Sequence, residues 1–160
     1  MAASMKALAK TLQSTALFVL MALWLLAYGT AQLWPASFWF EVHSVNAGPA
    51  RVGESVPMLV DRATHRKFDG SWVATVKAWD DTGDVGSGWV VYCTATGSAK
   101  YTPDSKLPRG LTLKWWTDGK CPSLDAGRYV ITTTWTIQPA LAILPAKRVS
   151  ADSNIFEVLP

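Results

Sequence analysis

The chain has 160 residues, which is enough for one domain and a targeting segment. Its formal net charge is +3, but the charges are unevenly placed: Lys6 and Lys10 come first, residues 11–40 carry no charge, and all 12 acidic residues lie from Glu41 onward. Because that remainder nearly balances basic against acidic side chains, it lacks the clustered positive charge that phosphate binding needs. The composition therefore argues against a nucleic-acid partner.

The first predicted element is an apolar helix at residues 12–34. It would extend about 35 Å, enough to cross a hydrocarbon core of about 30 Å, and it would then contact membrane lipid. Lys6 and Lys10 lie before the helix, and the positive-inside rule then predicts a cytoplasmic N-terminus at residues 1–11. The domain at residues 35–160 is expected outside the cytoplasm.

A cleaved signal peptide has the same pattern. The most apolar part of the segment is only about 12 residues long, within the range of a signal-peptide core. The small residues Gly29-Thr30-Ala31 offer a cleavage site at about Ala31. Cleavage would give a secreted domain, whereas retention would give a signal anchor, and the sequence leaves both open.

After residue 40 the sequence alternates short β-type runs with turn residues, and no segment keeps a helical period. A series of threonines at residues 128–138 favours a strand, since β-branched side chains suit a pleated surface. An acidic turn at residues 80–84 predicts a hairpin. These observations predict an all-β fold, an immunoglobulin-like antiparallel β-sandwich of about seven strands, preceded by one N-terminal transmembrane helix. The strands are expected at residues 38–46, 55–61, 71–79, 88–96, 111–117, 128–138 and 154–159.

A tyrosine-corner motif precedes the sixth predicted strand. Asp125, Gly127 and Tyr129 match the pattern D-x-G-x-Y, in which the tyrosine hydroxyl bonds to backbone upstream of its strand. A turn followed by an ordinary strand that begins with tyrosine gives the same letters. An antibody-type domain has a cysteine two residues after the tyrosine, where this chain has Ile131.

The two cysteines, Cys93 and Cys121, predict one structural disulfide, because an even number in an exported chain is typical of a bridge. The alternative is a buried thiol in the fourth strand and a second thiol in a loop. They are not spaced as a C-x-x-C redox pair, and no histidines accompany them as in a zinc site.

The motifs of the commoner enzymes are missing: there is no G-x-S-x-G, Walker A, H-E-x-x-H or dinucleotide-binding glycine pattern. Exposed strand or loop positions explain the two histidines, His43 and His65. Asp80, Asp81 and Asp84 do not follow the spacing of a calcium loop, so a solvated hairpin is expected. The sequence thus predicts a protein without catalytic activity, cofactor or metal.

Nine tryptophans are many for a chain of this length. In a strand at residues 111–117, alternation would place Trp115 and Trp116 on opposite faces. The outward one is a candidate platform for a sugar or an anchor for a protein. Covering a sheet edge or lying against the bilayer are the alternatives.

A basic stretch contributes the other candidate contact residues, Arg62, His65, Arg66 and Lys67. These side chains would contact lipid headgroups or an anionic envelope polymer. A charged edge strand that discourages aggregation is the plainer explanation. Together with Trp116, they form the predicted contact surface.

One motif in the C-terminal half carries a resemblance to known proteins. It comprises Trp115-Trp116-Thr117, Cys121-Pro122, Ala126-Gly127-x-Tyr129 and Thr132-Thr133-Thr134-Trp135. With it, the chain resembles small membrane-anchored proteins encoded by proteobacterial phages and prophages. This resemblance implies the bacterial inner membrane as the location, with the domain in the periplasm.

The leading functional hypothesis is a single-pass, membrane-anchored periplasmic interaction module without catalytic activity. Its partner would be an envelope protein, and a phage accessory acting in lysis or in superinfection exclusion is the setting that the resemblance suggests. The alternatives are a structural accessory subunit of a larger membrane complex and an envelope glycan-binding domain.

Overall fold

A computed structural model describes residues 2–81, 87–140 and 144–160 of the chain. It divides into two compact units, one ending at Trp34 and the other comprising Pro35–Pro160. Most of the predicted hairpin turn at residues 80–84 lies outside the described residues.

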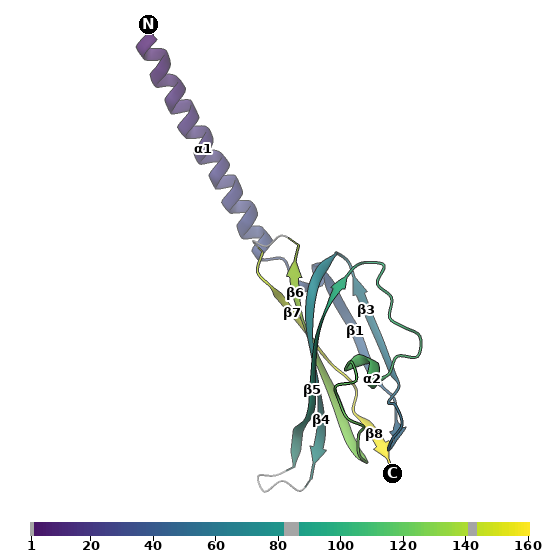
Figure 1. Ribbon diagram of the computed structural model, residues 1–160. Helices are drawn as coiled ribbons and strands as arrows, with labels where there is room; N and C mark the ends of the chain where they lie inside the picture. Colours follow the sequence, from purple (N-terminus) through teal and green to yellow (C-terminus); the bar gives the residue numbers. More distant parts are fainter. Residues whose placement is uncertain (1, 82–86, 141–143) are drawn as a thin grey trace. The chain divides into compact units, whose positions relative to one another are not determined.

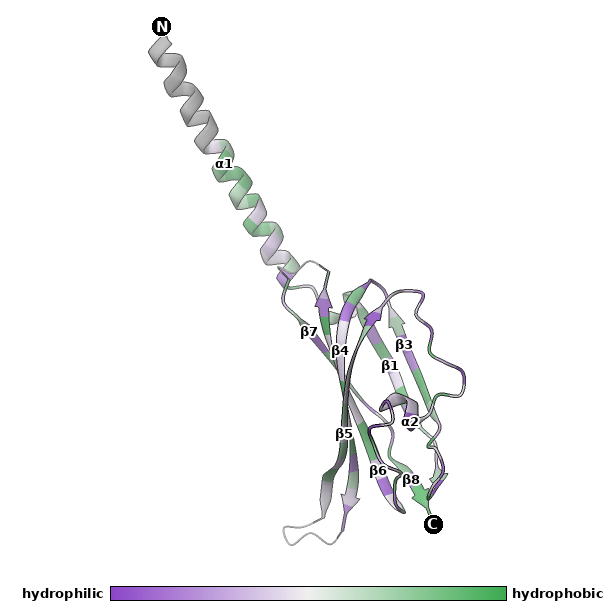
Figure 2. Ribbon diagram, in the orientation of Figure 1, coloured by the Kyte–Doolittle hydropathy of each residue, from purple (hydrophilic) through white to green (hydrophobic). Residues whose placement is uncertain are grey.

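The first unit is a single helix, α1 (Ala2–Gln32) (Figure 1). Within it, Thr15–Gln32 is long and apolar enough to cross a membrane, and a signal sequence near an N-terminus meets the same criteria. None of this window is buried, and Figure 2 shows that it is mostly hydrophobic. A helix that is apolar on all sides needs an apolar surrounding. The expectation of one N-terminal apolar helix is confirmed.

The second unit is built mainly of strands, so the predicted all-β class is confirmed (Figure 1). Its elements are a 3-10 turn η1 (Ala36–Phe38), β1 (Phe40–Ala47), β2 (Ala50–Arg51), β3 (Met58–Thr64), β4 (Phe68–Asp80), β5 (Gly88–Tyr101), the short helix α2 (Leu113–Trp116), β6 (Gly127–Pro139), β7 (Lys147–Asp152) and β8 (Phe156–Leu159). The larger sheet has the order β2-β8-β6-β4-β5, with β7 also paired to β6, and β1 pairs with β3 in a second sheet.

Six of the seven predicted strands overlap an observed one, but the strand predicted at residues 111–117 is wrong. The chain instead forms α2. The Thr112 side chain caps this helix by accepting a hydrogen bond from the backbone N–H of Trp115. Asp118 and Gly119 follow with positive φ angles of 53° and 68°, and the N–H of Gly119 bonds to the carbonyl of Lys114 at 2.7 Å. These capping interactions at both ends favour a helical turn rather than a strand at these residues.

The core lies between the facing sides of the two sheets. Phe40 of β1 is fully buried and contacts Phe68, Tyr101 and Trp135 of the larger sheet, with ring centroids 5.4–5.7 Å apart. The alternation predicted for the sixth strand is present in β6, whose inward side chains are all at most 3% exposed. They are Tyr129, Ile131, Thr133, Trp135 and Ile137.

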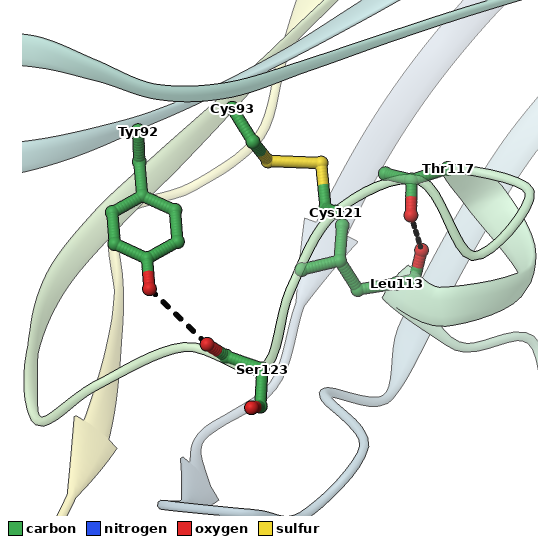
Figure 3. The surroundings of a disulfide bond; sticks show 6 residues. All are labelled: Tyr92, Cys93, Leu113, Thr117, Cys121 and Ser123. Atoms are coloured by element: carbon green, nitrogen blue, oxygen red, sulfur yellow. Dashed lines mark hydrogen bonds between the residues drawn. A yellow bond between two sulfur atoms is a disulfide. The ribbon is translucent and has the colours of Figure 1, made fainter.

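Cys93 and Cys121 form a disulfide that joins β5 to the loop after α2 (Figure 3). In the β4–β5 pairing Val76 faces Cys93 and Lys77 faces Val91, so β5 has a bulge at Tyr92. Neighbouring side chains of a regular strand point to opposite faces, but a bulge re-aims them. Figure 3 shows Tyr92 and Cys93 both directed at the loop, where the Tyr92 hydroxyl donates to the Ser123 carbonyl at 3.1 Å.

The same loop leads into the predicted tyrosine corner. The Tyr129 hydroxyl donates a hydrogen bond to the carbonyl oxygen of Asp125, four residues upstream, at 3.0 Å. Gly127, the middle residue of the motif, begins β6. The Tyr129 ring also packs edge-on against Tyr92 of β5, with centroids 5.7 Å apart. The loop is therefore held by the disulfide and by tyrosines from two strands.

Candidate functional site

An open groove of about 840 Å³ lies on the inner side of β4 and β5, beside the segment that contains α2. Residues of β3 and β6 also line it. Five aromatic side chains contribute to its walls and floor: Trp72, Tyr101, Trp115, Trp116 and Trp135.

The groove exists because one stretch of β5 carries small side chains. Ala95, Gly97 and Ala99 alternate on the face that also carries buried Tyr101. Ala95 is buried, whereas Ala99 is exposed although it lies on the same face. Larger residues at Gly97 and Ala99, which line the groove, would fill the space between the sheet and the α2 segment. Small ones leave it open.

Trp72 lies flat in this space against the backbone of the neighbouring strand. It pairs with Gly97 in the β4–β5 register, and a Cβ atom on Gly97 would be 2.5 Å from Cζ2 of the indole. A glycine in a strand often marks such a close approach. The Lys120 ammonium lies 6.0 Å from the Trp72 ring centroid and donates to the Thr96 carbonyl. The indole therefore has a fixed place in the groove wall.

Gly97→Ala should displace the Trp72 indole and lower the free energy of unfolding by about 1–3 kcal/mol, because the new methyl group overlaps the ring. The indole N–H signal of Trp72 in a two-dimensional NMR spectrum should shift. Gly88→Ala is the matched control on β5, since nothing lies within 4 Å of a Cβ atom there. The control should change stability by about 1 kcal/mol at most. Equal effects of the two variants would contradict the close approach at Gly97.

The two adjacent tryptophans of α2 have different surroundings. Trp116 is only 6% exposed, and its indole N–H donates to the Thr133 hydroxyl at 3.0 Å. Its ring packs edge-on against Trp135, with centroids 5.9 Å apart. Trp115 is 54% exposed at the groove. The prediction that one faces the core and the other outward is correct, but the outward one is Trp115, not Trp116.

Arg62 of β3 is the half-buried cation of the groove. Its guanidinium carbon lies 5.2 Å from the Tyr101 ring centroid and 5.7 Å from that of Phe40. Burial lowers the pKa of Arg62, although Tyr101 opposes this shift. Among the residues that the structure describes, no carboxylate forms an ion pair with Arg62.

The predicted contact surface does not form one patch. Arg62 and Trp116 both line the groove, whereas His65, Arg66 and Lys67 lie exposed at the turn between β3 and β4. There the His65 imidazole is 3.4 Å from the Glu41 carboxylate. The Arg66 guanidinium lies 4.0 Å from the centroid of the Phe38 ring.

Sequence reasoning missed Trp72, Gly97 and Tyr101 as site residues. The available signal was the alternation of small residues from Ala95 to Ala99, opposite a predicted strand that contains Trp72. The fourth strand was expected to end at residue 96, so Gly97 lay outside the predicted strand. In the structure β5 continues to Tyr101.

Within the described ranges, no group of three or more histidine, cysteine, aspartate or glutamate side chains is placed to hold a metal ion. The groove is instead an aromatic cavity with a positive side, which suits a small organic ligand. Comparison with known proteins found no matching family model, no matching curated sequence and no matching solved structure.

Proposed function

We propose that this chain is a membrane-tethered, non-catalytic binding module whose groove takes a carbohydrate of the cell envelope. The observation that carries the proposal is the groove itself, with the Trp72 indole laid against Gly97 and the exposed Trp115 on the α2 segment. Protein ligand sites have volumes of about 300–1,000 Å³ and are lined by apolar and aromatic side chains with a few polar groups. The groove meets this description.

The side chains that line the groove fit a carbohydrate ligand better than a protein partner. The C–H groups of a sugar ring pack on the electron-rich face of an indole, and its hydroxyl groups need polar partners beside that face. Ser105 and Thr112 line the same groove and supply hydroxyl groups. A protein partner would instead need a broad surface of roughly 800 Å² on this chain.

A binding role, not hydrolysis, fits the charged groups in the groove. Hydrolysis of a glycosidic bond generally uses two carboxyl groups, one on each side of the bond. Among the described residues that line the groove, Asp118 is the one carboxylate, and it lies 3.6 Å from the Lys120 ammonium. A single, ion-paired carboxylate supports recognition without cleavage.

The proposal includes an immunoglobulin-like sandwich as the scaffold. In its support, β1 pairs antiparallel with β3 in one sheet, and between these two strands the chain enters the other sheet, where β2 pairs parallel with β8. The order β2-β8-β6-β4-β5 and the hydrogen bond from Tyr129 to Asp125 at the start of β6 are further support. The disulfide joins β5 to a loop, unlike the inter-sheet bridge of antibody domains.

The proposed place of the domain is the periplasm of a bacterium, with α1 retained in the inner membrane and Lys6 and Lys10 on the cytoplasmic side. A phage accessory acting in lysis or superinfection exclusion would meet envelope glycan there.

This location makes a prediction for the intact chain. After expression in a proteobacterium, the protein should stay in the membrane pellet after an alkaline carbonate wash, with an unprocessed N-terminus by sequencing. A protease added to spheroplasts should digest the C-terminal domain. A soluble product that begins at about residue 32 would show a cleaved signal, and protection from the protease would contradict the orientation.

Carbohydrate binding is tested with the full chain in lipid nanodiscs, by co-sedimentation with purified peptidoglycan sacculi. Trp115→Ala should weaken binding roughly 3- to 10-fold, since one aromatic contact contributes about 0.5–1.5 kcal/mol. Trp89→Ala is the matched control, because Trp89 is also partly exposed but lies outside the groove. If neither the wild type nor the Trp89→Ala control sediments with the sacculi, the proposal is contradicted. It is also contradicted if Trp115→Ala and Trp89→Ala weaken binding equally.

A further inference from the structure

We propose that the carbohydrate bound in the groove carries an acidic group, a carboxylate or a phosphate, and that Arg62 binds it. This inference rests on the proposed carbohydrate function and adds the chemical class of the ligand.

Arg62 is held at the groove by two aromatic rings. It projects from β3 to the groove, where the rings of Phe40 and Tyr101 lie 5.7 and 5.2 Å from its guanidinium carbon. Arginine stacks on aromatic faces in this way, and its planar fork binds carboxylate or phosphate through two parallel hydrogen bonds. A guanidinium that is already held in place loses little conformational entropy when an anion binds.

Arg62 also has no counter-ion among the residues that the structure describes. Charged side chains are seldom removed from water unless they are paired. Arg62 is half-buried, yet in the described part of the chain no carboxylate pairs with it. Asp118 at the groove pairs with Lys120, and Lys114 adds further positive charge to the lining. The groove is therefore positive where the ligand would lie.

Tyr101 does not neutralise Arg62. Burial raises the pKa of the Tyr101 hydroxyl, although the positive charge of Arg62 opposes this shift. The hydroxyl thus stays neutral at physiological pH and carries no negative charge that could pair with Arg62. A guanidinium has five N–H donors, and one tyrosine oxygen cannot satisfy them all. An anionic ligand group would complete the set.

The test compares sugars that differ only in an acidic group, by calorimetric titration of the full chain in phosphatidylcholine nanodiscs. The disaccharide of N-acetylglucosamine and N-acetylmuramic acid carries a lactyl carboxylate that chitobiose lacks. N-acetylglucosamine 1-phosphate and N-acetylglucosamine form the corresponding phosphate pair. We expect at least tenfold tighter binding of one acidic sugar than of its neutral counterpart, and the pair that shows it identifies the acidic group.

The variants locate the effect. Arg62→Met keeps a long side chain against the two rings but removes the charge, so the preference for the acidic sugar over its neutral counterpart should vanish. Arg148→Met removes an exposed charge from β7, outside the groove, and should leave the preference unchanged. Circular dichroism checks that both variants are folded, and Arg62→Lys should restore part of the preference.

The outcomes separate the two proposals. Equal binding of acidic and neutral sugars by the wild type would overturn the role of Arg62 and leave carbohydrate binding standing. Binding of no sugar would overturn both proposals, and so would binding of an acidic peptide in place of every sugar. A preference that persists in Arg62→Met would overturn the assignment to Arg62 and retain an acidic ligand. The wild-type comparison holds even if a variant fails to fold.

Discussion

Trp116→Ala should lower the free energy of unfolding by about 3–5 kcal/mol, the range for truncating a large aromatic side chain in a core. Trp116 is 6% exposed and packs edge-on against Trp135. Its removal also leaves the buried Thr133 hydroxyl without the indole N–H that it accepts. The cavity and the lost hydrogen bond act in the same direction, so this is among the largest effects that we expect from one substitution.

Chemical denaturation of the full chain in detergent micelles, followed by near-ultraviolet circular dichroism, measures the change. Trp115→Ala is the matched control in the same helical turn, because Trp115 is 54% exposed. It should change stability by no more than about 0.5 kcal/mol. Trp116→Phe keeps ring packing but loses the donor, and it should cost about 1–3 kcal/mol. A smaller loss for Trp116→Ala than for Trp115→Ala would contradict the position of α2.

The pair Trp115-Trp116 also shows what the sequence could and could not predict. Their unequal burial was expected, because neighbours in a strand face opposite ways. The element was wrong, since α2 has only four residues and no helical period can appear in so short a segment. Its signals were the cap at Thr112 and the Asp118-Gly119 pair, which are as common in loops as beside helices. Which tryptophan is buried was then decided by tertiary packing against Trp135.

The strands also divide into those that their own sequence predicts and those that depend on tertiary packing. The core positions of β6 follow directly from its alternating apolar residues. β7 (Lys147–Asp152) was not predicted, because it has only two apolar inward residues, Val149 and Ala151, and both are only half-buried. It forms because β6 offers a free edge beyond its short pairing with β8. Such a strand depends on its neighbour more than on its own sequence.

The groove was the hardest feature to predict, since it depends on side chains that are small. Taken singly, small residues such as Ala95, Gly97 and Ala99 are compatible with an ordinary strand or turn. They define a cavity only once β5 is paired with β4, which places Trp72 across Gly97. Arg62 was predicted as part of a surface with His65, but strand geometry turns its side chain to the groove while His65 lies in the next turn.

Replacing both Cys93 and Cys121 by alanine should lower the free energy of unfolding by roughly 3–4 kcal/mol. The bridge closes a loop with a sequence separation of 28, and the chain-entropy estimate for a loop of this length lies in that range. This is a large part of the 5–15 kcal/mol that stabilises a typical domain. Reduction of the wild type should reproduce the loss, and the double variant should not respond to the reductant.

Removal of the disulfide should also affect the groove, because the bridged loop directly follows Asp118 and Lys120. Freed from β5, that loop would no longer hold Lys120 near Trp72, so sugar affinity should fall at temperatures where the domain is still folded. Tyr92→Phe provides the control: it removes the hydrogen bond to the Ser123 carbonyl but leaves the bridge, and it should cost only about 0.5–1.5 kcal/mol. If the double alanine variant loses no more than Tyr92→Phe, the disulfide does not stabilise the loop. An unchanged sugar affinity in the double alanine variant would show that binding in the groove does not depend on the bridged loop.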